Sequence, residues 1–156
     1  TLFPYTTLFR SYFDFFCCCS CAFSAASIGN PECIKVLLNN SFAPDPKDLE
    51  GMTPLLCAVA AGHTNCAKLL FEYGANIAAR DKNQRGSIHL AVENEKTEML
   101  KMLLERSGSQ CINIPDIQER TALHYAASST KLKVQAILKS DFRPYLLSLK
   151  WVWLDS

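Results

Sequence analysis

The sequence has no excess of charge of either sign. Its 156 residues include 16 lysines and arginines against 15 aspartates and glutamates, which gives a formal net charge of +1. This balance excludes two classes of protein, strongly basic nucleic-acid-binding domains and chains dominated by a polyacidic tail. We therefore expect no nucleic acid among the partners. No uncharged apolar run reaches the roughly 18 residues that a membrane-spanning helix needs. We therefore expect no direct membrane contact from residues 22–140.

The chain also lacks the residue patterns of common active sites. It has only six glycines, and they form no glycine-rich loop that would hold a phosphate. Paired carboxylates and nucleophile motifs are missing as well. We expect no enzymatic activity and no cofactor. Apolar residues make up 49% and charged residues 20% of the sequence, which is typical of a single folded domain.

Cysteine is too scarce for a disulfide scaffold. The eight cysteines are about 5% of the chain, below the roughly 8–10% of such proteins. Four of them crowd into Cys17–Cys21, where neighbours cannot all pair with one another. No second cysteine or histidine pair stands at zinc-ligand spacing. These features favour a reduced, cytoplasmic protein without a metal site.

The two ends differ from the middle. Residues 1–11, TLFPYTTLFRS, resemble the in-frame translation of a common sequencing-library adapter, so we interpret residues 1–21 as a non-native segment. A signal peptide is the alternative, but its leading charge, Arg10, belongs to the adapter-like stretch. Residues 141–156 are an unassigned tail: a capping helix, a partner-binding segment or further foreign translation. Because residue 1 is Thr rather than Met, we expect a piece of a longer protein.

The middle of the chain repeats with a period near 33 residues. Three residue types keep one register: Ala25, Ala58, Ala91 and Ala126; Asp48, Asp81 and Asp116; Leu37, Leu70 and Leu103. A domain over residues 22–140 is therefore predicted to hold four units, at about 22–47, 48–80, 81–115 and 116–140. The two extra residues of the third interval fall in a polar loop at 106–111.

Each unit is predicted to form a pair of short helices. In the second unit, Thr53 is placed to cap a helix that starts at Pro54 and breaks at Gly62. A second helix follows from about Asn65 to Tyr73, with Gly74 as a left-handed stop. One such pair cannot bury its apolar face alone, so at least three units must stack to make a core.

This pattern resembles the ankyrin repeat family over about residues 22–140. The run DLEGMTPLLCA at 48–58 carries the resemblance, followed by GH at 62–63, LL at 69–70 and GAN at 74–76; further copies begin at Asp81 and Asp116. This sequence departs from the family's pattern at several positions. It has Leu56 where the family has histidine, Gly86-Ser87 in place of Thr-Pro, and Glu95, Glu119 and Thr130 at glycine positions. Where such a turn needs a positive φ, a residue other than glycine is strained.

The resemblance implies an all-α solenoid of stacked helix-turn-helix units with short β-hairpin-like turns. It gives the histidines structural roles: His89 and His124 are expected to bond the local turn, and His63 to bridge neighbouring units. By helix position, Cys33, Cys57 and Cys66 are expected to be semi-buried and to pack as small apolar residues.

The resemblance also implies a protein–protein interaction scaffold or adaptor that binds its partner on a concave face. Carried over by register, the candidate partner-binding residues are Lys47, Leu49, Glu50, Met52, Ala60, Ala61, Arg80, Lys82, Asn83, Arg85, Glu93, Asn94, Ile117, Gln118, Arg120, Ser128 and Ser129. Five of these are cations and two are anions, so we expect the partner to present an acidic segment.

Two other roles fit the same residues. The chain is alternatively a fragment of the cytosolic ankyrin domain of a membrane protein, such as a cation channel of the transient receptor potential type, or the targeting module of a larger enzyme. Nothing within residues 22–140 separates these alternatives, because one fold serves many functions.

Overall fold

The computed structural model describes residues 19–107 and 111–128. Predictions for the adapter-like segment, for Ser129 and Thr130 and for the tail lie outside these residues. The described part is helical apart from its turns, one of which carries an isolated antiparallel bridge between Arg80 and Gly86. The expected all-α solenoid with hairpin-like turns is confirmed.

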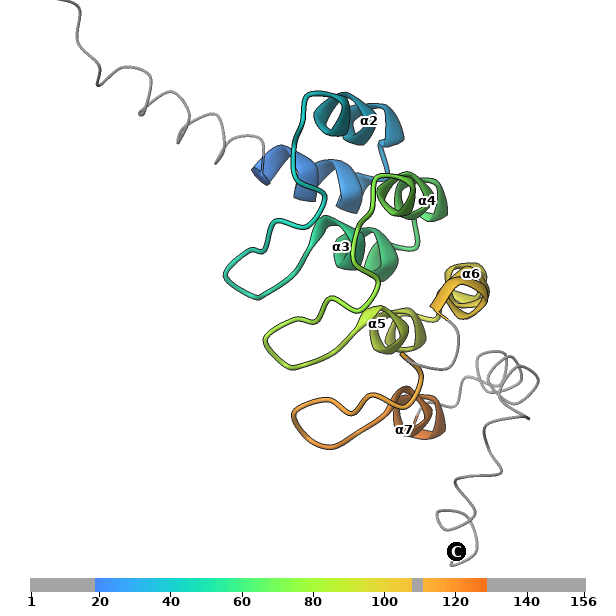
Figure 1. Cartoon of the computed structure of the whole chain (residues 1–156). Helices are drawn as coiled ribbons and strands as arrows, with labels where there is room; N and C mark the ends of the chain where they lie inside the picture. Colours follow the sequence, from blue (N-terminus) through green and yellow to red (C-terminus); the bar gives the residue numbers. More distant parts are fainter. Residues whose placement is uncertain (1–18, 108–110, 129–156) are drawn as a thin grey trace, which may run out of the picture.

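The helices come in consecutive pairs along the chain (Figure 1). Residues 19–28 form the first helix. It is followed by α2 (Pro31–Asn39), α3 (Pro54–Ala61), α4 (Thr64–Glu72), α5 (Ser87–Glu93), α6 (Thr97–Ser107) and α7 (Ala122–Ser128). The first helix includes residues on both sides of the expected boundary at 21/22, so that boundary lies inside an element.

The pairs stack into two layers. Helix α3 packs against α5, and α5 against α7, which forms one row; α2 packs against α4 in the other row. Within each pair, α3 contacts α4 and α5 contacts α6. Three turns, residues 40–53, 73–86 and 111–121, project to the same side, next to α3, α5 and α7 (Figure 1). We call the exposed surface of these turns and of α3, α5 and α7 the turn face.

Local capping sets the helix ends, as the sequence predicts for the second unit. The Thr53 hydroxyl accepts a hydrogen bond from the backbone N–H of Leu56 at 3.3 Å, and Pro54 begins α3. Gly62 ends that helix at φ 89°. The following helix starts one residue before the predicted Asn65 and ends at Glu72, with Tyr73 as its cap.

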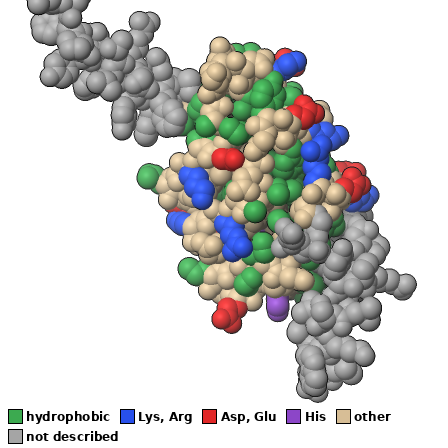
Figure 2. Space-filling view, in the orientation of Figure 1, with side chains coloured by type: hydrophobic (Ala, Val, Ile, Leu, Met, Phe, Trp, Pro, Cys, Tyr) green, Lys and Arg blue, Asp and Glu red, His purple; other side chains and the backbone are tan. Residues whose placement is uncertain are grey.

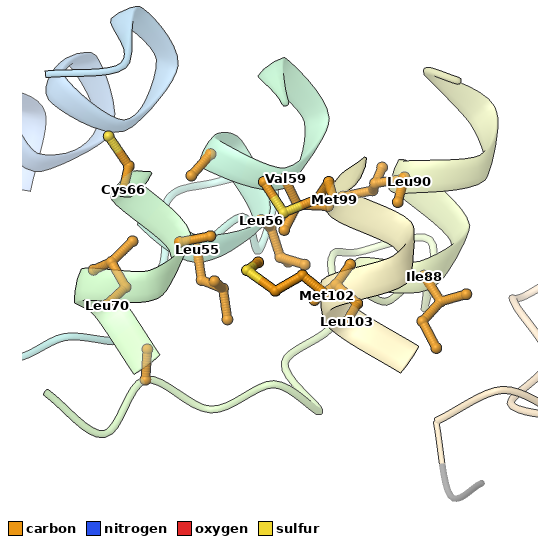
Figure 3. Close-up of a cluster of buried hydrophobic side chains, with 14 of the residues drawn as sticks. Leu55, Leu56, Val59, Cys66, Leu70, Ile88, Leu90, Met99, Met102 and Leu103 are labelled. Atoms are coloured by element: carbon orange, nitrogen blue, oxygen red, sulfur yellow. The ribbon is translucent and has the colours of Figure 1, made fainter. Parts of the chain in front are cut away.

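One continuous core joins the units. Leu55 and Leu56 of α3 and Leu100 and Leu103 of α6 are fully buried. Figure 3 shows side chains from α3, α4, α5 and α6 converging, with Met99 of α6 directed toward Val59 of α3. Side chains from neighbouring pairs thus share the same core, which is why a single pair would not be stable alone.

Three register positions adopt positive φ in successive units, whether or not glycine is present. Gly29, Gly62 and Glu95 occupy the first position, Gly51, Gln84 and Glu119 the second, and Ser41 and Gly74 the third. The strain expected at Glu95 and Glu119 is thus present, with φ of 57° and 60°. Gln84, at 60°, and Ser41, at 63°, are two further strained positions that the family resemblance did not single out.

The expectation for the cysteines is correct for Cys57 and wrong for Cys33. Cys57 is half-buried, Cys66 is fully buried and Cys33 is exposed. Cys33, Cys66 and Met99 occupy the same position in successive units, and Met99 is also buried. The exposure of Cys33 follows from its place in the outermost described pair, since no further described pair packs on that side.

Candidate functional site

Each turn of the turn face is held by one aspartate. Asp81 Oδ1 accepts backbone N–H bonds from Asn83 and Arg85 at 2.9 and 2.8 Å. Oδ1 of Asp48 and Oδ1 of Asp116 likewise each accept bonds from the backbone N–H groups two and four residues further along the chain, at 2.8–2.9 Å. A side chain that binds two amides of its own turn fixes the loop backbone. The three turns are therefore pre-formed.

Arginines complete this arrangement in two of the turns. Arg85 Nε donates to Asp81 Oδ2 at 2.9 Å, and Arg120 Nη2 donates to Asp116 Oδ2 at 2.9 Å. Tyr125 donates to the same Asp116 oxygen at 2.7 Å. Burial alone would raise the pKa of the Asp116 carboxyl, but the bond from the backbone N–H of Arg120, together with the side-chain bonds from Tyr125 and Arg120, outweighs burial and holds the pKa well below its usual range.

The three histidines have the structural roles that the resemblance implies. The backbone N–H of Gly86 donates to His89 Nδ1 at 3.3 Å, and that of Thr121 to His124 Nδ1 at 3.1 Å. His63 Nε2 lies 3.0 Å from the carbonyl oxygen of Ser27 in the preceding unit. Each of these bonds joins an imidazole ring to a backbone group.

Adjacent turns are also connected to each other. The backbone N–H of Lys82 donates to the carbonyl of Glu50 at 2.8 Å, and that of Ile117 to the carbonyl of Asn83 at 3.0 Å. The side chains of Lys82 and Glu50 form an ion pair. These bonds run from turn to turn and keep the three tips in one row.

The candidate partner-binding residues divide by exposure. Ten are exposed: Lys47, Leu49, Glu50, Lys82, Glu93, Asn94, Ile117, Gln118, Arg120 and Ser128. Six are half-buried: Met52, Ala60, Ala61, Arg80, Asn83 and Arg85. Of these six, Met52 and Ala60 pack against the core, which limits what they present to a partner. Ser129 lies outside the described residues.

Charge on the turn face is mixed, although the candidate residues alone include five cations and two anions. That count left out the turn aspartates. Turn 73–86 has three cations and one aspartate, whereas turn 40–53 has one lysine and three carboxylates. Basic and acidic side chains are interspersed on the face seen in Figure 2. Positive charge is therefore concentrated in the second turn.

The described residues show no sign of a metal centre or a membrane segment. No group of three or more potential ligands among them is arranged to hold a metal ion. In the same part of the chain, no helix combines the length and apolar character needed to cross a membrane.

Paired helices, rows of turns and a shared core define a stacked helical-repeat protein. Two family descriptions of ankyrin repeats match the chain: "Ankyrin repeats (3 copies)" over residues 13–81, and "Ankyrin repeats (many copies)" over 61–104 and 88–137. The chain belongs to the ankyrin repeat family. The first match begins at residue 13, ahead of the expected domain start at 22.

Curated relatives are much longer than this chain. It is 32% identical to inversin of Canis lupus familiaris over 110 residues, which is 70% of the chain and 10% of that protein. It is 32% identical to the nuclear factor NF-kappa-B p105 subunit of Gallus gallus over 120 residues, 74% of the chain and 12% of that protein. Against the transient receptor potential channel pyrexia of Drosophila melanogaster, identity is 35% over 130 residues, 81% of the chain and 13% of that protein.

The chain thus spans about a tenth of the length of these relatives. Family and relatives together indicate a non-catalytic repeat module and are consistent with a role in protein interaction.

Proposed function

We propose that the chain is a cytoplasmic scaffold or adaptor module that binds a protein partner on the turn face, the concave side expected of such an array. One observation supports this above the others: apolar side chains stand at the tips of pre-formed turns. Leu49 is fully exposed at 101% and Ile117 is 67% exposed. Large apolar groups held in solvent on a fixed backbone favour binding, because little ordering entropy remains to be lost.

The position is repeated along the array. Leu49, Lys82 and Ile117 occupy the same register position in the three turns, so the row of tips presents an apolar, a basic and an apolar side chain in order. A partner segment that lies across the tips meets all three.

Site-directed photo-crosslinking tests this function. p-Benzoylphenylalanine replaces Leu49, Lys82 or Ile117 in the 156-residue chain, and Lys68 or Glu105 on α4 and α6 as matched exposed controls. We expect the three turn positions to crosslink one protein from extracts of the source organism and the controls to give none. The crosslinked protein is then identified, purified and titrated against the unmodified chain. Crosslinks confined to Lys68 and Glu105 would place binding on the opposite side and contradict the proposal.

A second candidate is the cytosolic ankyrin domain of a channel. The match to pyrexia, named as a transient receptor potential channel, covers 81% of the chain and favours this alternative. A full-length transcript read across the codons for residues 22–140 tests it. Membrane-spanning segments in the same reading frame would support the channel, whereas an early stop codon or a catalytic domain would exclude it.

A further inference from the structure

A hollow separates the first two turns of the turn face. Its volume is about 320 Å³, and six of its lining residues are Asp45, Lys47, Thr53, Asn76, Arg80 and Gln84. Asp45 already has a structural partner here, because the backbone N–H of Asn76 lies 2.9 and 3.1 Å from its two carboxylate oxygens. That contact joins the two turns across the hollow.

The cations of this hollow differ from the others on the turn face. Lys82 pairs with Glu50, Arg85 with Asp81 and Glu93, and Arg120 with Asp116. Within the described ranges, 19–107 and 111–128, neither Lys47 nor Arg80 forms an ion pair with a carboxylate. Arg80 Nη1 makes only a long contact of 3.5 Å with Gln84 Oε1, which leaves most of its donors available.

We propose that this hollow binds one aspartate or glutamate side chain of the protein partner, between Lys47 and Arg80, with an apolar neighbour of that residue packing on Leu49. The proposal rests on the proposed function and specifies the partner's chemistry. It also confines the expected acidic contact to this hollow, where Lys47 and Arg80 form no ion pair with a described carboxylate.

The charges of the hollow fit a carboxylate better than a phosphate. Lys47 and Arg80 against Asp45 leave one net positive charge, which a single carboxylate neutralises, whereas a phosphate dianion would leave an excess of negative charge. A guanidinium also matches the two oxygens of a carboxylate in a bidentate fork. Leu49, exposed in the same turn as Lys47, favours a polypeptide over a small anion.

Two synthetic peptides test the proposal: GSLELSG and the matched neutral control GSLQLSG. Each is titrated into the ¹⁵N-labelled 156-residue chain and followed by NMR shifts of the backbone amides. We expect GSLELSG to shift amides of turns 40–53 and 73–86 and to bind about five- to tenfold more tightly than GSLQLSG. Lys47→Gln and Arg80→Gln should each weaken binding about five- to tenfold.

Matched variants keep the result interpretable. Lys68→Gln removes an exposed cation from α4 and should leave binding unchanged. Arg80→Lys keeps the positive charge but loses the bidentate guanidinium. Its affinity for GSLELSG should lie between that of the unsubstituted chain and that of Arg80→Gln. Lys47 is exposed and is not part of the core, so Lys47→Gln tests the hollow even if an Arg80 variant misfolds.

Three results would overturn the proposal: no shift at the highest soluble peptide concentration, equal affinity for both peptides, or unchanged binding by Lys47→Gln. Inorganic phosphate and acetate are titrated in the same way. If phosphate shifts these amides more strongly than acetate does, the hollow is a phosphate site instead. If Leu49, Lys82 and Ile117 crosslink a partner while the peptides leave the hollow unshifted, the proposed function stands and this inference fails. If crosslinks form only on α4 and α6 while the peptide binds in the hollow, the proposed function fails and the hollow still binds a carboxylate.

Discussion

The imidazole of His89 connects its own turn to the backbone of Arg120, 31 residues further along the chain. Its Nδ1 accepts from the N–H of Gly86, so the ring proton must be on Nε2, which donates to the Arg120 carbonyl at 3.2 Å. The rings of His89 and Tyr125 also form a T-shaped pair, with centroids 5.7 Å apart. One neutral tautomer therefore joins the third and fourth units.

Acidification should weaken this connection. Burial lowers the pKa of His89. The bond to the Arg120 backbone raises this pKa and so offsets the effect of burial only in part. A pKa lower in the folded than in the unfolded state means that the unfolded chain binds more protons. The contribution of His89 to the free energy of unfolding is therefore complete above the unfolded pKa of about 6.5. It is lost as the pH falls below that value, by at most about 1.4 kcal/mol per pH unit.

Urea unfolding between pH 7.5 and 5.5 measures this effect. His89→Gln should be less stable than the natural chain at pH 7.5 and should lose less stability on acidification. Parallel pH profiles for the two proteins would show that His89 does not contribute.

Gly29→Ala should destabilise the chain more than Gly74→Ala. Both glycines have φ near 84°, at 83° and 84°. A Cβ at Gly29 would collide with the ring of His63, whereas one at Gly74 would meet nothing within 4 Å. Thermal unfolding should show a loss of about 1 kcal/mol for Gly74→Ala, from backbone strain alone, and about 2–3 kcal/mol for Gly29→Ala. Equal losses would mean that the His63 ring moves aside freely.

Glu119→Gly should stabilise the chain although it removes a side chain. Glu119 has φ 60° at the position that Gly51 occupies two units earlier. Relief of the left-handed strain exceeds the extra entropy of glycine in the unfolded chain, which leaves a gain of about 0.5–1 kcal/mol. Glu119→Ala keeps the Cβ and is the control, for which no gain is expected. Chemical denaturation of both variants measures the difference.

Cysteine reactivity should follow burial rather than sequence position. Burial, assisted by the nearby negative charge of Asp48, raises the pKa of the Cys57 thiol to about 11. Burial raises the pKa of Cys66 as well. Because the thiolate is the reactive form, iodoacetamide at pH 8 should modify exposed Cys33 at least tenfold faster than either. Peptide mass spectrometry resolves the sites, and equal rates would contradict the burial.

The sequence was sufficient to predict the repeat because register is a local property. Alanines and leucines at fixed spacing predicted the units and the stacked core, and Thr53, Pro54 and Gly62 predicted the ends of α3. The family resemblance implied the histidine bonds, since each links groups whose places in the register are known.

What the sequence did not reveal were pairings that depend on neighbouring side chains in space. The family register makes Arg85 and Arg120 candidate partner contacts, and the structure adds that each binds the aspartate four residues before it. The signal was present, because an arginine follows Asp81 and Asp116 at that spacing while Met52 follows Asp48. The exposure of Cys33 also differs from the expectation, because it depends on the end of the stack rather than on residue type.

The single backbone bonds from Lys82 to Glu50 and from Ile117 to Asn83 have a mechanical consequence. In the part of the chain that the structure describes, the main helix contacts lie within a unit or between adjacent units, so tension applied along the stack loads one junction after another. Under force the array should yield one pair of helices at a time, in a staircase of small extensions, and shorten again stepwise when the load is released.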